Sequence, residues 1–333
     1  MNERVPARPA VLADAPLQLE VESLSKRFQI ATPRGGKASL NAVNAVSFAV
    51  RRGETFSIVG ESGCGKSTLG RCVARLLEPS EGRVRFEGED ISALRGERLR
   101  TLRRRIQFIF QDPYSSMNPR LRVRRVLAEP LRNFGMDGAA IDARLKALLA
   151  LVSMGADALD KYPHQFSGGQ RQRLVIARAL ALEPDFIVCD EPVSALDVSV
   201  QAQVINLLVD LQARLGLTYL FISHDLSVVR HLSHRVAVMY LGRIVEEGTR
   251  DEVFNNPKHP YTQALLAAVP RFSRGARARP RSAPLTGEIP SPLSPPSGCA
   301  FRTRCPLARP VCAQEAPPLQ VFSDSHYSRC HFR

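Results

Sequence analysis

Short apolar runs bounded by polar or glycine-containing segments dominate the hydrophobic pattern of this chain. Runs of this length, flanked by turn-forming residues, predict buried β-strands. In residues 17–30 apolar and polar side chains alternate, as in a strand with one buried face. The predicted strands are 17–30, 43–50, 55–59, 83–86, 106–110, 185–190 and 219–222.

Other segments carry apolar residues at the spacing of an amphipathic helix. The predicted helices are 69–77, 95–105, 121–134, 141–152 and about 167–182. Residues 31–40 contain a proline and two glycines and are expected to form a loop. Strands interspersed with helices in this way indicate an α/β protein.

The loop after the predicted strand 55–59 fits the phosphate-binding pattern G-x-x-x-x-G-K-[ST]. Its glycines let backbone N–H groups turn toward phosphate oxygens, Lys66 adds a positive charge, and the Ser67 hydroxyl can ligate Mg²⁺. A glycine-rich turn without a ligand is the alternative, but the order strand, loop, helix favours the phosphate site. The predicted nucleotide-binding residues are Gly60, Glu61, Ser62, Gly63, Cys64, Gly65, Lys66, Ser67 and Thr68.

A second predicted anion site lies at the start of the helix that follows Phe166. Ser167 is a natural N-cap, and Gly168 and Gly169 allow the backbone to approach a ligand closely. One domain rarely needs two phosphate sites on separate helices, whereas a dimer that shares ATP between subunits does.

The apolar strand 185–190 ends in one acid, Asp190, and a second acid, Glu191, follows it directly. Asp190 is expected to hold Mg²⁺ and Glu191 to orient or deprotonate the attacking water, although a pair of surface acids at a turn is the alternative. His224 follows the next apolar strand and is expected near the phosphates. Phe28 is placed to stack on a nucleobase, but a core aromatic is about equally consistent with the sequence.

The charge balance of the 333-residue chain is +14, which suits nucleic acid, an anionic membrane surface or a solvated basic face. Part of the excess lies in the arginines between 271 and 281, and no nucleic-acid-binding motif accompanies them. No run reaches the roughly 18 apolar residues that span a bilayer, and residues 1–16 lack the apolar centre of a signal peptide. We therefore expect a cytoplasmic protein that binds no specific nucleic acid.

Four of the seven cysteines, Cys299, Cys305, Cys312 and Cys330, follow one another with the spacing C-x5-C-x6-C-x17-C. This is not the paired C-x2-C of zinc ribbons. Four thiolates suit a [4Fe–4S] cluster or Zn²⁺, with His326 and His331 as substitute ligands, and unliganded thiols are the third possibility.

Taken together, these motifs resemble those of the ATPase subunits of ABC transporters. The chain has the phosphate loop at 60–68, a Q-loop glutamine at Gln111, the signature Ser167, Gly168, Gly169 and Gln170, the acids Asp190 and Glu191, a D-loop at 194–197, and His224. The resemblance implies a P-loop NTPase domain over 17–270, built from a RecA-like core, an antiparallel β subdomain and a helical subdomain. Residues 1–16 are then a flexible N-terminus and 271–333 a cysteine-containing extension.

Several segments resemble the oligopeptide/dipeptide permease ATPases more closely, in particular their second, F-type subunit. These segments are 110–120, 195–203, 256–262 and 295–306. The resemblance favours the iron–sulfur cluster over zinc at the tail cysteines. It implies ATP-driven import of dipeptides or oligopeptides, with nickel complexes, glutathione, or a soluble ATPase that acts on nucleic acid as alternatives.

The resemblance also implies a mechanism and partners. Two homologous ATPase subunits, expected as a heterodimer, close head to tail on two MgATP, with the P-loop of one facing the signature of the other. Phe28 stacks on adenine, Glu191 acts on the water, His224 contacts the γ-phosphate, and Ser67, Gln111 and Asp190 hold Mg²⁺. The loop 114–120 is expected to grip one of two integral membrane permease subunits, at the cytoplasmic face of the inner membrane. An extracytoplasmic binding protein delivers the cargo.

Overall fold

A computed structural model describes residues 15–31, 36–112, 116–268 and 287–332. The chain divides into two compact units, each built from separate stretches of sequence. Unit 1 contains 1–50, 54–92 and 224–333, and unit 2 contains 51–53 and 93–223. The N-terminus 1–14, Tyr114 in the predicted permease-contacting loop, and 269–286, which include the start of the predicted extension, lie outside the described residues.

Unit 1 contains one sheet in the order β2-β1-β4-β5, in which the β1–β4 and β4–β5 pairs are antiparallel. Its strands are β1 (Leu17–Ala31), β2 (Lys37–Arg51), β4 (Glu81–Phe86) and β5 (Glu89–Asp90). The prediction of a loop through residue 40 was wrong, because β2 begins at Lys37. Ala38, Leu40 and Ala42 do alternate with polar residues, as in a strand, but residues 37–42 are exposed or only partly buried, and the proline and glycines at 33–36 gave the stronger signal for a loop.

A second set of strands in unit 1 has the order β11-β12-β10-β9-β3. These are β3 (Thr55–Val59), β9 (Arg235–Tyr240), β10 (Arg243–Thr249), β11 (Leu319–Val321) and β12 (Tyr327–Arg329). The β3–β9 pair is parallel, and the other pairs are antiparallel. The apolar run of β3 is buried throughout, as its sequence predicts.

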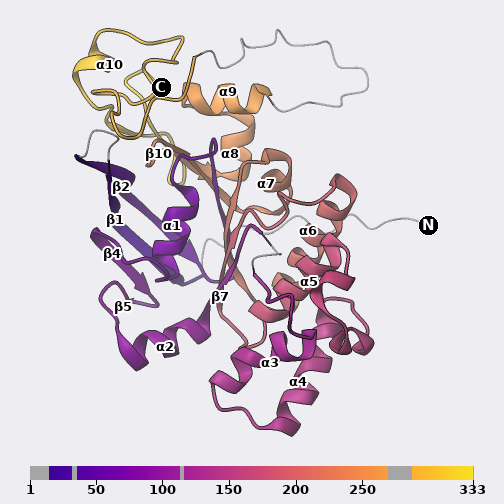
Figure 1. The fold of residues 1–333 in the computed structure, drawn as a ribbon. Coiled ribbons are helices and arrows are strands. Elements are labelled where there is room, and N and C mark those ends of the chain that lie inside the picture. The colour runs from indigo at the N-terminus through magenta and orange to yellow at the C-terminus, as the bar shows by residue number, and fades with distance from the viewer. Residues whose placement is uncertain (1–14, 32–35, 113–115, 269–286, 333) are drawn as a thin grey trace, which may run out of the picture. The chain divides into compact units, whose positions relative to one another are not determined.

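The helices of unit 1 are α1 (Lys66–Val73), α7 (Leu226–Leu232), α8 (Arg250–Asn255), α9 (Pro260–Ala268) and α10 (Val311–Gln314). Helix α1 ends before the predicted Leu77 because Arg75 adopts a left-handed conformation with φ +54°. The segment from 287 to 332 lies beside β10 and α9, where Figure 1 draws it in yellow. Its first described residues, 287–310, form neither helix nor strand.

Unit 2 holds three parallel strands in the order β8-β7-β6. They are β6 (Ile106–Ile109), β7 (Phe186–Asp190) and β8 (Thr218–Ser223). Its helices are α2 (Gly96–Arg105), α3 (Val123–Asn133), α4 (Gly138–Leu151), α5 (Gly168–Ala179) and α6 (Val198–Leu215), with 3-10 turns at Ala156–Asp160 and Pro163–Gln165. The helices α3, α4 and α5 pack against one another (Figure 1).

Candidate functional site: a nucleotide loop and an acidic strand end

The phosphate loop connects the buried strand β3 to helix α1 in unit 1. Two of its glycines are required by close backbone approach. A Cβ on Gly60 would lie 2.2 Å from the Met239 carbonyl oxygen, and one on Gly65 would lie 2.1 Å from that of Ala42. Gly65 is the N-cap of α1 and has φ +104°, a conformation that side chains rarely adopt. The backbone of the loop is therefore tightly packed, and the loop leads directly into the N-terminus of α1, as in a phosphate-binding loop.

Lys66, the first residue of α1, is 4% exposed. Its ammonium donates hydrogen bonds to the carbonyl oxygens of Gly60 at 2.8 Å and Glu61 at 3.0 Å. The lysine head is thus held by the first residues of its own loop. Burial raises the pKa of the neighbouring Cys64 thiol, so this variable loop position carries a neutral side chain.

The acidic strand end lies in unit 2, where β7 delivers Asp190 and Glu191. Both are buried, at 1% and 9% exposure. Glu191 has φ +47°, a strained conformation for a non-glycine residue, and its N–H donates to the Ile222 carbonyl at 2.9 Å. Such strain persists only where the surrounding structure enforces it, and it clusters at functional positions.

Gln111 lies two residues after the neighbouring strand β6, and its Nε2 donates to Glu191 Oε2 at 2.9 Å. The structure therefore brings the predicted Q-loop glutamine and the predicted base into direct contact. Ser67 lies in unit 1, whereas Gln111 and Asp190 lie in unit 2, so the predicted Mg²⁺ ligands come from both units.

The signature residues form a capping box at the start of α5. Ser167 Oγ accepts from the Gln170 N–H at 3.3 Å, and Gln170 Oε1 accepts from the Ser167 N–H at 3.1 Å. Arg171 fastens the preceding turn by donating to the carbonyls of Pro163 and His164. The predicted N-cap is confirmed, and the helix ends at Ala179 rather than near Leu182.

His224 follows β8 directly and is exposed, as a residue that contacts a ligand needs to be. Phe28 lies near the end of β1, half-buried, with the Lys26 ammonium 5.2 Å from its ring centre. Phe28 is thus not fully buried, and its stacking on a nucleobase stays a prediction.

The four tail cysteines all line one small cavity in unit 1, of about 10 Å³, together with His259 and His331. Burial raises the pKa of the Cys299 thiol, and its neighbours Cys312, Cys305 and Cys330 add to the shift. The Cys299 N–H donates to the Cys312 carbonyl at 2.8 Å, which joins two of the segments. Within the described residues, however, no group of three or more His, Cys, Asp or Glu side chains is arranged to hold a metal ion.

The sequence did not identify the residues that hold Glu61 of the phosphate loop. Arg304 and Tyr261 both bond to it, from positions 243 and 200 residues later in the chain. Neither stood in a pattern that indicates nucleotide chemistry, and only the folded chain places them there.

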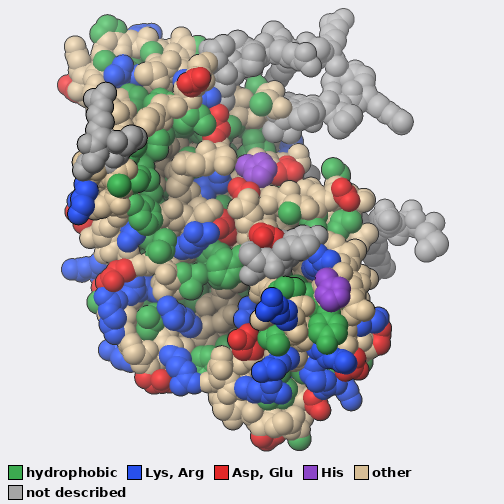
Figure 2. All heavy atoms as spheres, viewed as in Figure 1, with side chains coloured by type: hydrophobic (Ala, Val, Ile, Leu, Met, Phe, Trp, Pro, Cys, Tyr) green, Lys and Arg blue, Asp and Glu red, His purple; other side chains and the backbone are tan. Residues whose placement is uncertain are grey.

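The described helices include none long and apolar enough to cross a membrane. On the face drawn in Figure 2, Lys and Arg side chains of the described residues lie among Asp and Glu side chains. This is the pattern of a solvated basic surface.

Comparison with protein families gives two matches along the chain. Residues 43–194 match the ABC transporter family, and residues 245–312 match the C-terminal region of oligopeptide/dipeptide transporters. The second match covers the segment that includes Tyr261, Arg304 and three of the tail cysteines.

Relatives of known name align with nearly the whole chain. A probable peptide ABC transporter ATP-binding protein, y4tS of Sinorhizobium fredii, is 54% identical over 318 residues, covering 95% of this chain and 90% of the relative. The oligopeptide transport ATP-binding protein AppF of Bacillus subtilis is 50% identical over 317 residues, covering 94% and 96%.

Among solved structures, the ATP-binding cassette MJ0796, described as a dimer in a post-hydrolysis state bound to ADP and Pi, is similar with a TM-score of 0.63. It is 29% identical and covers 70% of this chain and 98% of its own. The predicted P-loop NTPase fold is thereby confirmed. The chain belongs to the ATP-binding subunits of ABC transporters, in the group that carries the oligopeptide/dipeptide transporter C-terminal region.

Proposed function

We propose that this chain hydrolyses ATP to drive the import of dipeptides or oligopeptides. The hydrogen bond from Gln111 to Glu191, beside the buried Asp190, carries the hydrolytic part of the proposal. The C-terminal match and the peptide-transport names of the relatives support the cargo class. Nickel complexes and glutathione remain the alternative cargoes.

In the proposed mechanism the N–H groups of loop 60–68 and Lys66 bind the β- and γ-phosphates, and Phe28 stacks on adenine. Ser67, Gln111 and Asp190 would hold Mg²⁺, which supplies charge stabilisation to the transferring phosphoryl group. Glu191 accepts a proton from the attacking water, and Gln111 holds its carboxylate in place. His224 donates a hydrogen bond to the γ-phosphate.

The signature completes this site from a second subunit. Ser167 and the N–H groups of Gly168 and Gly169 face the γ-phosphate bound by the partner's P-loop. Closure of such a pair with ATP, and its reopening after hydrolysis, supplies the differential affinity that shifts a permease between two states. The proposed partners are a homologous ATPase subunit, two integral membrane permease subunits and an extracytoplasmic binding protein. The chain then acts peripherally, at the cytoplasmic face of the inner membrane.

The decisive experiment reconstitutes the chain with its permease subunits, paired ATPase and binding protein in vesicles, and follows ATP-dependent uptake of a labelled peptide. Glu191→Gln removes the general base and should lower ATP turnover by about 10²–10⁴-fold while ATP still binds. Glu183→Gln is the matched control, since Glu183 is exposed and pairs with Arg144. Uptake of nickel or glutathione in place of peptide would overturn the cargo class, and full turnover in Glu191→Gln would overturn the base.

We further propose that the four tail cysteines hold a [4Fe–4S] cluster, with Zn²⁺ as the alternative. The thiols line one cavity, and four thiolates suit either group by ligand type. The resemblance to the oligopeptide permease ATPases is what favours the cluster over Zn²⁺.

Metal and acid-labile sulfide analysis of anaerobically purified protein tests this assignment. Iron and sulfide in equal amounts, lost in Cys305→Ser and kept in Cys72→Ser, are the expected result. Cys72 is a suitable control because it is buried in α1 and does not line the thiol cavity. Zinc without iron would show that the cysteines hold Zn²⁺ instead of the cluster. Protein without either metal would show that they are free thiols.

A further inference from the structure

The phosphate loop contains a carboxylate, Glu61, that is paired with an arginine from the C-terminal extension. Arg304 Nη1 lies 2.7 Å from Glu61 Oε2, and Nη2 lies 2.9 Å from Oε1. The pair is bidentate, which is the strongest and most directional arrangement of these two groups. The Arg304 side chain is 4% exposed and that of Glu61 is 22% exposed, so water screens the pair only partly.

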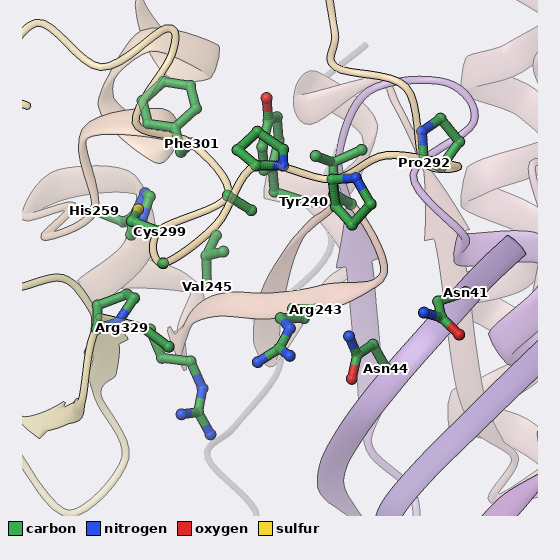
Figure 3. A pocket seen from close by; sticks show the side chains of 17 residues that line it. Asn41, Asn44, Tyr240, Arg243, Val245, His259, Pro292, Cys299, Phe301 and Arg329 are labelled. Atoms are coloured by element: carbon green, nitrogen blue, oxygen red, sulfur yellow. The ribbon is translucent and has the colours of Figure 1, made fainter. Parts of the chain in front are cut away.

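A second contact holds the same residue through its backbone. The Glu61 N–H donates to Tyr261 Oη at 2.9 Å. Tyr261 is fully buried, and its ring packs 4.7 Å from Tyr240 and 5.3 Å from Phe301. Figure 3 shows Tyr240 and Phe301 on the wall of a cavity of about 130 Å³, with Cys299 close by. The phosphate loop and the extension therefore meet through a packed aromatic cluster.

The extension presents Arg304 on a tight turn. The Arg304 N–H donates to the Phe301 carbonyl at 3.0 Å, and the Arg302 N–H donates to the Cys299 carbonyl at 3.1 Å. Phe301 is 1% exposed, so its burial anchors the turn, and three residues later Arg304 reaches Glu61. The backbone that carries Arg304 is therefore held by contacts other than the pair itself.

The Arg304–Glu61 pair offsets an unfavourable negative charge in the phosphate loop. A free carboxylate in a phosphate loop repels the triphosphate, and a buried guanidinium cancels that charge. Glu61 also carries one of the two carbonyls that hold the Lys66 ammonium. A carboxylate fixed by Arg304 keeps that carbonyl, and so the lysine, in one position.

We propose that Arg304 is a positioning residue for ATP, which neutralises Glu61 and fixes the start of the phosphate loop from the C-terminal extension. This rests on the proposed function only as far as ATP binding, and it requires neither a particular cargo nor a metal. The extension is thereby part of the nucleotide site rather than an appendage to it.

The test measures the dissociation constant of a fluorescent ATP analogue on the purified chain, and KM and kcat of the assembled transporter. Arg304→Met should weaken ATP binding and raise KM about tenfold, the effect of one lost charge-assisted pair, while kcat changes less than about twofold. Arg302→Met is the matched control, since Arg302 lies on the same turn and donates to Ser297, and its ATP affinity should be unchanged.

Removing both charges gives the sharper result. In the double variant Glu61→Gln, Arg304→Met no carboxylate remains to repel phosphate, so ATP affinity should return to within about threefold of the parent chain. A residue that only stabilises the fold would lower the active fraction and kcat in both variants, without rescue. Parent-like affinity in Arg304→Met, or additive losses in the double variant, would overturn the proposal.

Arg304→Lys covers the case in which Arg304→Met does not fold. Lysine keeps the charge but cannot form the bidentate pair, so an intermediate loss of ATP affinity is expected. Parent-like affinity in this folded variant would show that the bidentate geometry has no effect on ATP. Because the binding assay uses the purified chain, a transporter that imports a cargo other than peptide leaves the result unchanged.

Discussion

Two helix N-termini carry the predicted phosphate contacts, and they are built in opposite ways. Helix α1 begins after Gly65, which has no side chain to cap the first turn. Helix α5 begins after Ser167, whose hydroxyl and backbone N–H are both bonded to Gln170. The first terminus leaves the capping of its turn to a ligand, whereas the second caps itself.

This difference matches the two roles that we propose. We propose that the P-loop binds phosphate within its own subunit, where Lys66 is held by carbonyl oxygens of the loop and Glu61 by Arg304. In the same proposal the signature meets phosphate only when another subunit brings it, and the capping box keeps α5 stable until then.

Lys66→Ala should have the largest effect, because it removes the buried charge at the α1 terminus. We expect ATP hydrolysis to fall more than about 100-fold, measured as phosphate release. Lys161→Ala is the control, since Lys161 is exposed and pairs with Asp157 in unit 2. Substantial hydrolysis in Lys66→Ala would contradict the assignment of the phosphate loop.

Ser167→Ala should distinguish the role of the α5 N-terminus from that of the α1 N-terminus. Loss of the cap should cost about 1 kcal/mol of stability, and hydrolysis by the assembled pair should fall about tenfold or more while the isolated chain binds ATP normally. Thr249→Ala removes the same kind of capping box from α8, where Thr249 pairs with Glu252. Equal losses of hydrolysis in both variants would show that Ser167 acts only as a cap.

The P-loop strand should also respond to acid. His234 Nδ1 accepts a hydrogen bond from the Thr55 N–H of β3 at 2.9 Å, and burial, with Arg250 nearby, lowers the His234 pKa to about 4. His234 in the unfolded chain takes up a proton near pH 6.5, so the contribution of neutral His234 to the free energy of unfolding is fully present above that pH. This contribution falls by about 1.4 kcal/mol per pH unit as the pH decreases from 6.5 toward 4.

Hydrogen exchange at several pH values, corrected for intrinsic rates, measures this loss. Peptides from β3 should lose protection between pH 6.5 and 4, and those from β7 in unit 2 should change less. His234→Gln, which cannot take up the proton, should remove the pH dependence of β3. An unchanged slope in that variant would assign the acid sensitivity to another group.

Phe28→Ala should have the smallest effect, because one stacked base contributes about 1–3 kcal/mol. Affinity for ATP should fall by about fivefold or more, and Phe28→Tyr should retain it. Inorganic triphosphate, which has no base, should bind both variants equally. A loss of triphosphate affinity in Phe28→Ala would place Phe28 in the support of the loop rather than at the base.

Much of the nucleotide machinery could be predicted from the sequence because its signals are local. The apolar runs of β3 and β7 are buried throughout, and Ser167 caps its helix as its type and position suggest. Gln111 and Glu191 are 80 residues apart, and only the resemblance to known ATPases associated them.

The parts of the fold that the sequence did not predict depend on side-chain contacts between residues that are distant in sequence. Nothing in the sequence marks Glu246 and Glu247 as buried, yet they are 0% and 1% exposed within β10. Glu246 accepts from the backbone of Lys258 and His259 and bonds His326, and Glu247 bonds Arg235 and Tyr327. Polar residues can be buried when they are paired, and no periodicity reveals pairs that come from so far away. The domain boundaries at 17, 270 and 271 remain predictions.

The pairing of β12 with β10 has a consequence for biosynthesis. Nascent chains fold from the N-terminus as they are made, and contacts between distant residues form late. Glu246 leaves the ribosome 80 residues before His326, and Glu61 leaves it 243 residues before Arg304. If Arg304 positions the loop as we propose, a newly made phosphate loop stays an unfinished anion site until the 243 residues that separate Glu61 from Arg304 have been synthesised.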